Sequence, residues 1–251
     1  MRYLLLIVAC FALTCFSCGE AAGNDDNAVQ PVKPGSPGEI SADVTDTARS
    51  LIEVQMESIG LVDVASVDST LLVDLRYSTT NNFTGRDLYG DLNRCYLQKD
   101  VAEKLAKAQA ELRRRFPYYG LLVFDGARPV SIQRYMWDSI SFLPGERQKY
   151  LSNPENRSLH NYGAAVDLTI IDAQGRELDM GTPYDFFGEM AHPREEEHFF
   201  ESGQLTESQV ANRMLLREVM RAAGFTGIET EWWHFNSTSR ANAAVTYPLV
   251  E

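Results

Sequence analysis

Hydrophobic residues in the middle of the chain recur at the spacing of a helix face. The residues of this face lie three or four positions apart and predict a first helix: Leu97, Val101, Leu105, Ala108 and Leu112. Asp100 and Glu103 are placed as a capping box at the start of this helix. A second helix is predicted over 131–140.

A last helix is predicted to begin near Thr206 and to end at Gly224, because glycine commonly terminates helices. Gln209 stands at the capping-box position, three residues after Thr206. This helix is expected to bury one side of its surface. Its predicted inward residues are Val210, Met214 and Val219.

Short runs of β-branched and large apolar residues predict strands between these helices. The clearest runs are 70–77, 121–124 and 166–171, and a turn around Gln174 and Gly175 makes the last of them the first arm of a hairpin. Strands and helices alternate without the regular order of a parallel sheet. The sequence therefore predicts an α+β fold, a single domain in which a mostly antiparallel central sheet is flanked by helices.

The N-terminal pattern is typical of an exported protein. Arg2 precedes an apolar run over 3–16, which is too short to span a bilayer comfortably but suits an export signal. The run ends at Ser17-Cys18-Gly19, which resembles the lipobox of bacterial lipoproteins, whose cysteine is lipidated and becomes the mature N-terminus. We expect a periplasmic or cell-envelope protein, attached to a membrane only through a lipid on Cys18. A free exported protein and an uncleaved anchor are the alternatives.

Composition divides the chain into an export signal (1–18), a flexible tether (19–49) and one domain (50–251). The tether is rich in proline and small polar residues, which cannot bury enough apolar surface to fold. Cys95 is then the lone cysteine of the folded part and is predicted to be a packed thiol without a disulfide.

Composition also narrows the functional classes. The chain has 251 residues, and 44% of them are hydrophobic, which excludes a disordered protein. Its 23 basic residues are outnumbered by 35 acidic ones, which gives a net charge of −12. Such a surface repels phosphate backbones, so we expect no nucleic-acid partner.

Two of the four histidines lie near carboxylates in a pattern that suits a metal site. His160, Asp167 and His234 would supply two imidazoles and one carboxylate, a common set for a catalytic zinc with an open fourth position. His160 and Asp167 would be about 23 Å apart along a straight strand and about 10 Å apart along a helix, too far for ligands of one ion. The segment must therefore bend, and Gly163 provides the freedom. Glu231 stands where a general base is needed.

A structural role is the alternative for these residues. His160 and Asp167 would then be ordinary loop and strand residues, and His234 a core histidine beside two tryptophans. His192 and His198 are further candidate ligands, although the charged run 192–198 is typical of a solvated loop.

Five stretches together resemble the zinc D,D-peptidases, and more narrowly the D-alanyl-D-alanine dipeptidases of the vancomycin-resistance type. The similarity extends from about residue 60 to about residue 238. The five stretches occur in the same order as in this family. Such an ordered set is far more specific than one His-x-x-Gly motif. The stretches are 73–77 with 82–85, 125–129, 158–167, 180–186 and 231–234.

The resemblance implies a zinc-dependent hydrolysis of D-alanyl-D-alanine to two D-alanines, with one zinc ion per chain. His160, Asp167 and His234 would be the ligands, and Glu231 the catalytic base that accepts a proton from a zinc-activated water. The main partner of the protein would be its substrate, a small dipeptide.

The same resemblance implies roles for three other residues. Arg128 would be the cation beside the scissile carbonyl, and Asp185 would hold the free ammonium of the substrate, which restricts the enzyme to dipeptides. Ser158 would help to line the site. A structural alternative for Asp185 is that it only caps the turn after Gly181.

Three other functions remain open at this point. A D,D- or L,D-carboxypeptidase acting on peptidoglycan stem peptides would share the metal site without needing Asp185. A non-catalytic, zinc-dependent wall-binding or signalling module would not need Glu231 and Arg128 together. A dipeptidase of the same fold with another substrate is the third.

Overall fold

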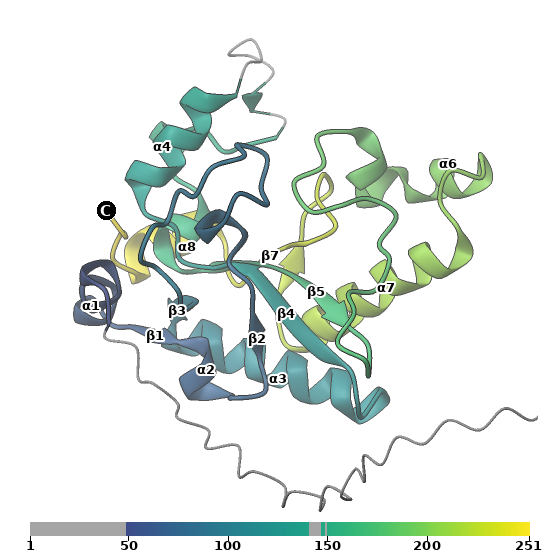
Figure 1. Ribbon diagram of the computed structural model, residues 1–251, viewed down its shortest axis with the longest axis horizontal. Coiled ribbons are helices and arrows are strands. Elements are labelled where there is room, and N and C mark those ends of the chain that lie inside the picture. The colour runs from purple at the N-terminus through teal and green to yellow at the C-terminus, as the bar shows by residue number, and fades with distance from the viewer. Residues whose placement is uncertain (1–48, 141–146, 149) are drawn as a thin grey trace, which may run out of the picture. The chain divides into compact units, whose positions relative to one another are not determined.

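A computed structural model describes residues 49–140, 147–148 and 150–251, and a five-stranded sheet lies at its centre (Figure 1). β2 pairs with β4 in parallel, and the other neighbouring strands are antiparallel. The predicted α+β fold with a mostly antiparallel sheet is therefore confirmed, with one parallel pair that makes the sheet mixed. In sheet order the strands are β2 (Leu72–Val73), β4 (Gly120–Asp125), β5 (Ala165–Ile171), β7 (His234–Asn236) and β6 (Thr226–Gly227).

The parallel pair follows from the connection between its strands. The chain from β2 to β4 passes through the long helix α3 (Lys99–Arg115), and parallel neighbours need such a crossover. The strand predicted over 70–77 is shorter than expected, because the chain turns after Val73 and forms a 3-10 helix, η1, over Arg76–Ser78. The predicted hairpin after β5 is reduced to one bridge, between Ile171 and Glu177.

α3 confirms the first predicted helix but not its capping box. Its predicted inward residues from Val101 to Leu112 are all fully buried. The residue at the N-cap position is Gln98, whose side chain does not cap the helix. Gln98 ends strand β3 (Tyr96–Gln98), and its amide donates instead to the carbonyl of Tyr162. Asp100 lies inside the first turn, so the strand preceding α3, rather than a capping box, sets where it begins.

α7 (Glu207–Ala222) begins with the predicted capping box of Thr206 and Gln209. Its inward face differs from the prediction, because Met214 is 48% exposed whereas Arg213 is completely buried. Val210 is half-buried. A hydrophobic pattern does not place an arginine in the core. Arg213 is accommodated there by the carboxylate of Glu196 and by two backbone carbonyls. α7 is also not the last helix, because α8 (Arg240–Thr246) follows it.

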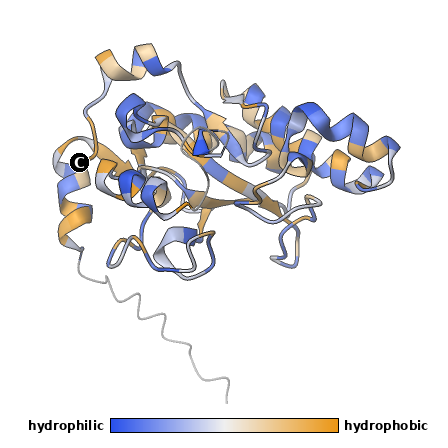
Figure 2. Cartoon of the chain, turned by 90° about the horizontal axis from the view of Figure 1, so that it is seen from above, coloured by the Kyte–Doolittle hydropathy of each residue, from blue (hydrophilic) through white to orange (hydrophobic). Residues whose placement is uncertain are grey.

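The remaining elements surround the central sheet. α4 confirms the helix predicted over 131–140. α3 and α7 pack against each other, α3 also packs against β4, and α7 packs against β5. In the view of Figure 1, α4 lies at the upper left and α6 at the upper right. Figure 2 shows hydrophobic residues concentrated along the central strands. The elements are α1 (Leu51–Ser58), β1 (Leu61–Asp63), α2 (Val64–Val67), β3 (Tyr96–Gln98), α4 (Val130–Ser139) and α6 (Glu196–Glu201).

The predicted export signal, Cys18 and the tether up to residue 48 lie outside the described residues. The described residues from 49 onward belong to one compact unit. None of their helices combines the length and the apolar character needed to cross a membrane. Cys95 is buried and free, as predicted.

Candidate active site

The register of the sheet brings three polar residues together at its centre. Asp167 on β5 lies opposite Asp125 on β4 on one side and opposite His234 on β7 on the other. Neighbouring strands are about 4.8 Å apart, so such opposite residues can touch although they are far apart in sequence. The sheet itself therefore places a carboxylate beside an imidazole.

His160 reaches the same place from a short helix that bends into β5. It lies in the 3-10 helix η3 (Leu159–Tyr162), whose N-cap is Ser158. Gly163 follows with a left-handed backbone (φ 61°), which a residue with a side chain adopts only at a cost, and β5 begins two residues later. The bend predicted from the sequence is thus observed at Gly163.

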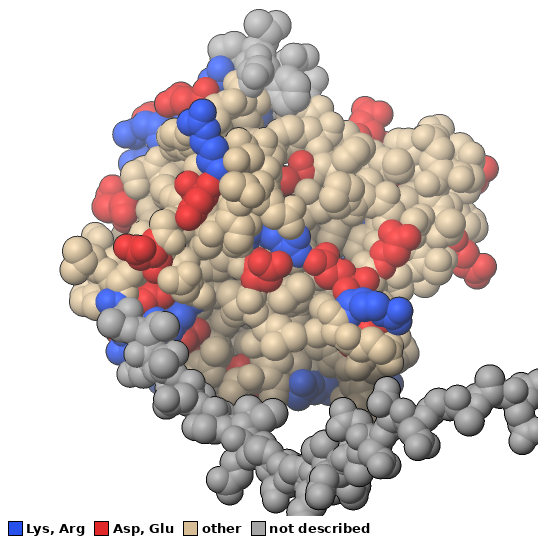
Figure 3. All heavy atoms as spheres, viewed as in Figure 1, with Lys and Arg blue, Asp and Glu red and all other residues tan. Residues whose placement is uncertain are grey.

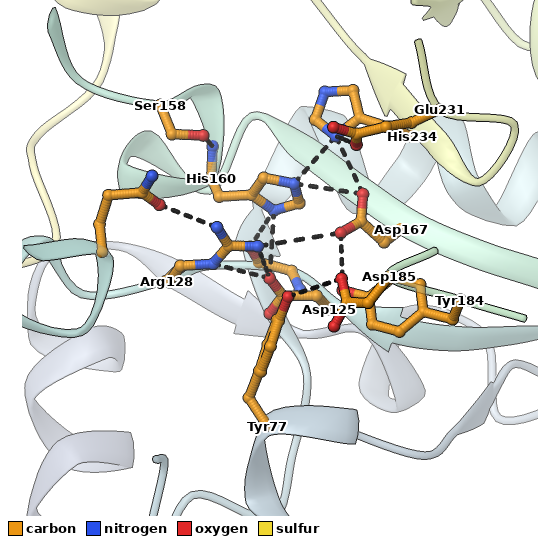
Figure 4. A network of polar contacts seen from close by, with 12 residues as sticks. Tyr77, Asp125, Arg128, Ser158, His160, Asp167, Tyr184, Asp185, Glu231 and His234 are labelled. Carbon is orange, nitrogen blue, oxygen red and sulfur yellow. Dashed lines mark hydrogen bonds and ion pairs between the residues drawn. The ribbon is translucent and has the colours of Figure 1, made fainter. Parts of the chain in front are cut away.

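Three ligand atoms converge at this point (Figure 4). His234 Nδ1 lies 2.9 Å from Asp167 Oδ1 and 3.1 Å from His160 Nε2, and His160 Nε2 lies 3.3 Å from the same carboxylate oxygen. Atoms bound to one ion at about 2 Å in a tetrahedral arrangement would be separated by about 3.3 Å. The separations in the protein fit that arrangement.

Each imidazole is oriented by a hydrogen bond at its other nitrogen. His160 Nδ1 lies 2.7 Å from the carbonyl oxygen of Gly126, and His234 Nε2 lies 2.8 Å from Asn236 Oδ1. Both partners are acceptors, so each imidazole donates outward and directs its remaining nitrogen towards the centre. Partners of this kind orient metal-binding histidines. Among the described residues, these three form the group of histidine and acidic side chains that could hold a metal ion.

The electrostatics of the cluster favour a cation. Burial alone would raise the pKa of Asp167, but the two imidazoles outweigh this effect and hold it well below its usual range. Burial would lower the pKa of His234, yet its hydrogen bond and charge interaction with Asp167 raise it to about 9. Two imidazole nitrogens and one carboxylate oxygen are ligands that zinc accepts in catalytic sites. The residues present therefore fit a zinc ion.

Glu231 lies at the edge of this cluster, in the loop before β7. Its Oε2 is 3.9 Å from His234 Nδ1, and 22% of its side chain is exposed. Burial raises the pKa of Glu231, although the imidazoles oppose the shift. A carboxylate beside the ligands, with a raised pKa and access to the pocket, can accept and return a proton.

Arg128 is fixed on the other side of the cluster. Its Nε donates to Asp125 Oδ2 at 2.9 Å, Nη2 also contacts Asp125, and Nη1 donates to Gln133 Oε1 at 2.8 Å. Burial would lower the pKa of Arg128, but Asp125 raises it well above its usual value. Gly126 permits this arrangement, since a Cβ there would lie 2.9 Å from the backbone oxygen of Tyr96. The guanidinium stays charged and immobile, with Nη2 3.8 Å from Asp167 Oδ2.

Asp185 faces the pocket from a segment without regular secondary structure. Its backbone is left-handed (φ 59°), a conformation that costs energy for a residue other than glycine. Oδ1 accepts a hydrogen bond from Tyr77 at 3.0 Å. Burial raises the pKa of Asp185 to about 8, even though the hydrogen bond from Tyr77 lowers it. No salt bridge joins this carboxyl group to a cation among the residues that the structure describes, and a cation placed beside it would stabilise its charged form.

All the predicted site residues of the folded part meet in one pocket. Ser158 is nearly buried there, and its hydroxyl accepts a hydrogen bond from the backbone N–H of His160, so it both lines the pocket and caps η3. On the face shown in Figure 3, acidic and basic side chains are interspersed. The predicted residues that line the pocket are Arg128, Ser158, His160, Asp167, Asp185, Glu231 and His234.

His192 and His198 are not part of the metal-binding group. The charged run that contains them is not a solvated loop, because Glu196 begins helix α6 and is only 6% exposed. Its carboxylate pairs with Arg213 and Arg217 of α7. Charge alone therefore gave the wrong prediction for this segment, since its central carboxylate is neutralised inside the fold.

Several residues that support the site were not predicted from the sequence. Asp125 holds Arg128, Tyr77 donates to Asp185, and the hydroxyl of Tyr184 donates to Asp167 Oδ2 at 3.0 Å. These three lie in the stretches that carry the family resemblance, which was the available signal. Asn236 lies outside those stretches, and only its place two residues from His234 on one strand identifies it.

The chain is similar in sequence to known dipeptidases. Residues 57–250 match the family model described as D-ala-D-ala dipeptidase, Peptidase_M15. The chain is 32% identical over 190 residues to a D-alanyl-D-alanine dipeptidase of Escherichia coli (strain K12), covering 76% of this chain and 89% of that one. It is 31% identical over 177 residues to a D-alanyl-D-alanine dipeptidase of Enterococcus faecalis (strain ATCC 700802 / V583), covering 64% and 83%.

Among solved structures, the vancomycin resistance D,D-pentapeptidase VanY in complex with Zn(II) is similar with a TM-score of 0.36. It is 16% identical, and the match covers 62% of this chain and 80% of that one. The match to the family model extends over nearly all of the folded part, from residue 57 to residue 250. The chain belongs to the D-Ala-D-Ala dipeptidase family of peptidases.

Proposed function

We propose that this protein hydrolyses the D-alanyl-D-alanine dipeptide to two D-alanines with the help of one zinc ion. The observation that carries the proposal is the convergence of three ligand atoms, from His160, Asp167 and His234, in a pocket that also holds Glu231. The family of the chain supports both the reaction and the substrate.

The three ligands would hold one zinc ion. When bound, zinc acts as a Lewis acid and lowers the pKa of a water ligand to about 7. The outward hydrogen bonds of the two imidazoles keep the ligand nitrogens available for the ion.

Glu231 would move the proton. Its carboxylate lies beside the ligand cluster and is partly open to the pocket, so it can accept a proton from the attacking water at Oε2. The raised pKa of Glu231 helps it to return that proton to the nitrogen of the leaving D-alanine. One carboxylate thus serves as base and then as acid.

Arg128 would stabilise the negative charge that develops on the scissile carbonyl oxygen. Its guanidinium is held by Asp125 and Gln133, so it does not need to reorganise during the reaction. Charges fixed in a buried site in this way are worth more than the same charges in water.

Asp185 would select free dipeptides. The substrate's ammonium would supply a cationic partner to this half-buried carboxyl group, with Tyr77 holding one carboxylate oxygen in place. A longer peptide presents an amide at this position and leaves the carboxylate unpaired, which is unfavourable. This feature favours a dipeptidase over a carboxypeptidase acting on stem peptides. A wall-binding module would need neither Glu231 nor Arg128.

The test compares free D-Ala-D-Ala with N-acetyl-D-Ala-D-Ala. We expect hydrolysis of the free dipeptide to be much faster, to stop with a chelator and to return when zinc is added. Zinc content per chain, measured on the purified protein, should approach one. Full activity without metal would contradict the zinc mechanism, and faster hydrolysis of the acetylated substrate would favour the carboxypeptidase.

We also propose that the protein is exported and attached to a membrane through a lipid on Cys18. The support is the N-terminal sequence, with its short apolar run and lipobox-like end. Metabolic labelling with a fatty acid should mark the wild type and not Cys18→Ala. Equal labelling of both proteins would contradict the anchor.

A further inference from the structure

The segment that carries Asp185 is bound at both of its ends by helix α7 and in its middle by Tyr77, Asp167 and Trp232. Residues 181–188 contain no helix or strand, and their backbone is left-handed at Gly181 and at Asp185. A segment of this kind is kept in one conformation by its contacts with neighbouring elements. In Figure 1 it belongs to the green part of the chain beside α7.

Arg213 of α7 contacts both ends of this segment. Its Nε donates to the carbonyl oxygen of Met180 at 2.6 Å, and its Nη2 donates to the carbonyl oxygen of Met190 at 3.0 Å. The guanidinium is a rigid, planar fork, so two carbonyls bound to it are held at a fixed separation. Arg213 therefore closes residues 181–189 into a loop of defined width.

Burial makes these two contacts important. Arg213 is fully buried, so its N–H groups have no water to bind. The carboxylate of Glu196 lies 3.4 Å from Nη1, whereas Arg217 binds the same carboxylate more closely through two hydrogen bonds of 2.7 Å. The two carbonyl oxygens are thus the closest acceptors of Arg213.

Neighbouring residues of α7 secure only the start of the loop. Gln209 donates to the side chain of Asp179, and Asn212 donates to its backbone carbonyl. Arg213 is the member of this group that also reaches Met190, at the far end. Loss of its fork would release that end and leave the start attached.

We propose that Arg213 is a positioning residue for substrate recognition, which holds Asp185 in place by fixing both ends of its loop. The inference rests on the proposed role of Asp185 in binding the substrate's ammonium. It assigns to a buried residue of α7, outside the pocket, a part in the preference for free dipeptides over acylated peptides.

The experiment compares Arg213→Lys with Arg217→Lys as a matched control. Lysine keeps the positive charge but has one nitrogen, so it cannot bridge both carbonyls. Arg217 contacts Glu196 and neither carbonyl. For Arg213→Lys we expect KM for D-Ala-D-Ala to rise about 10- to 100-fold, the range for a lost hydrogen bond to a charged group, with kcat and zinc content little changed. N-acetyl-D-Ala-D-Ala should be affected far less, and Arg217→Lys should keep the wild-type ratio.

A double-mutant cycle separates positioning from general stability. If Arg213 acts through Asp185, the effect of Arg213→Lys on the free dipeptide should vanish in an Asp185→Asn background. Amide hydrogen exchange should also become faster in 181–190 and stay unchanged in β5. Equal losses for both substrates, or effects that multiply in the double variant, would overturn the inference.

Two other outcomes separate the role of Asp185 from that of Arg213. If Asp185→Asn alone impairs both substrates alike, the role proposed for Asp185 fails, whatever Arg213→Lys shows. If Arg213→Lys does not fold, Arg213→Gln replaces it, because glutamine removes the fork without leaving a buried charge, and Glu196 keeps its hydrogen bonds to Arg217. The same change in substrate ratio is then expected, and an unchanged ratio would overturn the inference.

Discussion

The ligand cluster and the loop that carries Asp185 lie in one pocket but are held in different ways. Asp167 and His234 are opposite each other on paired strands, so backbone hydrogen bonds of the sheet fix their separation. Asp185 lies in a segment without regular structure, has a left-handed backbone, and is held by the hydroxyl of Tyr77. The cluster is part of the core, whereas the loop is attached to it by side chains.

One pocket thus combines fixed chemistry with adjustable recognition. Ligand atoms must meet within a few tenths of an ångström, and a sheet register provides that precision. A substrate ammonium tolerates a looser partner, which a loop can supply. Changes at the cluster should therefore affect catalysis with any substrate, and changes at the loop should affect substrate choice.

The largest effect is expected for Glu231→Gln. The change keeps the size of the side chain but removes the proton acceptor, so kcat should fall about 10²- to 10⁴-fold for both substrates. Zinc content should be unchanged, because Glu231 is not one of the converging ligands. His234→Ala is the comparison and should lose zinc as well as activity. Retention of most of the wild-type rate by Glu231→Gln would place the base elsewhere.

Arg128 should give the next largest effect. Removing a well-placed partner of a developing oxyanion typically lowers kcat about 10²- to 10³-fold, so Arg128→Ala should reach that range, with Arg128→Lys in between. Rates with the free and the acetylated dipeptide should fall together. A change confined to KM would instead assign Arg128 to substrate binding.

The supporting hydrogen bonds of the ligands should have a smaller effect, on metal affinity. Tyr184→Phe removes the donor to Asp167, and Asn236→Ala removes the acceptor of His234. Each should weaken zinc binding about 10- to 100-fold in a chelator competition. Tyr96→Phe is the matched control, because this buried tyrosine bonds to Glu57 and not to a ligand. Unchanged zinc affinity in both variants would show that the sheet register alone orients the ligands.

The smallest effect is expected for the stability of the metal-free protein. Burial raises the pKa of Asp185 to about 8, so the folded state keeps a proton that an unfolded aspartic acid loses near pH 4. The wild type should therefore lose stability as pH rises from about 4 to about 8 and then level off. Asp185→Asn lacks this loss, and its Tm relative to the wild type should increase by a few degrees over that range. A constant difference in Tm between Asp185→Asn and the wild type from pH 5 to pH 9 would contradict the raised pKa of Asp185.

Much of the fold followed from local patterns in the sequence. Residues of α3 from Val101 to Leu112 have the helical period and are buried, and the capping box at Thr206 fixes the start of α7. The error at Met214 and Arg213 shows the limit of such patterns. An arginine enters the core when distant carbonyls and a carboxylate satisfy it, and neither partner is visible in the local sequence.

The residue types of the active site and the bend at Gly163 could be predicted from the sequence, because ligand chemistry and chain geometry depend on neighbours along the chain. The carbonyl that orients His160, the hydroxyl that supports Asp167 and the contact that holds Asp185 depend on the tertiary structure. These contacts join residues from 17 to 108 positions apart. They depend on sheet register and helix packing, which are set by the burial of the whole core rather than by any single segment.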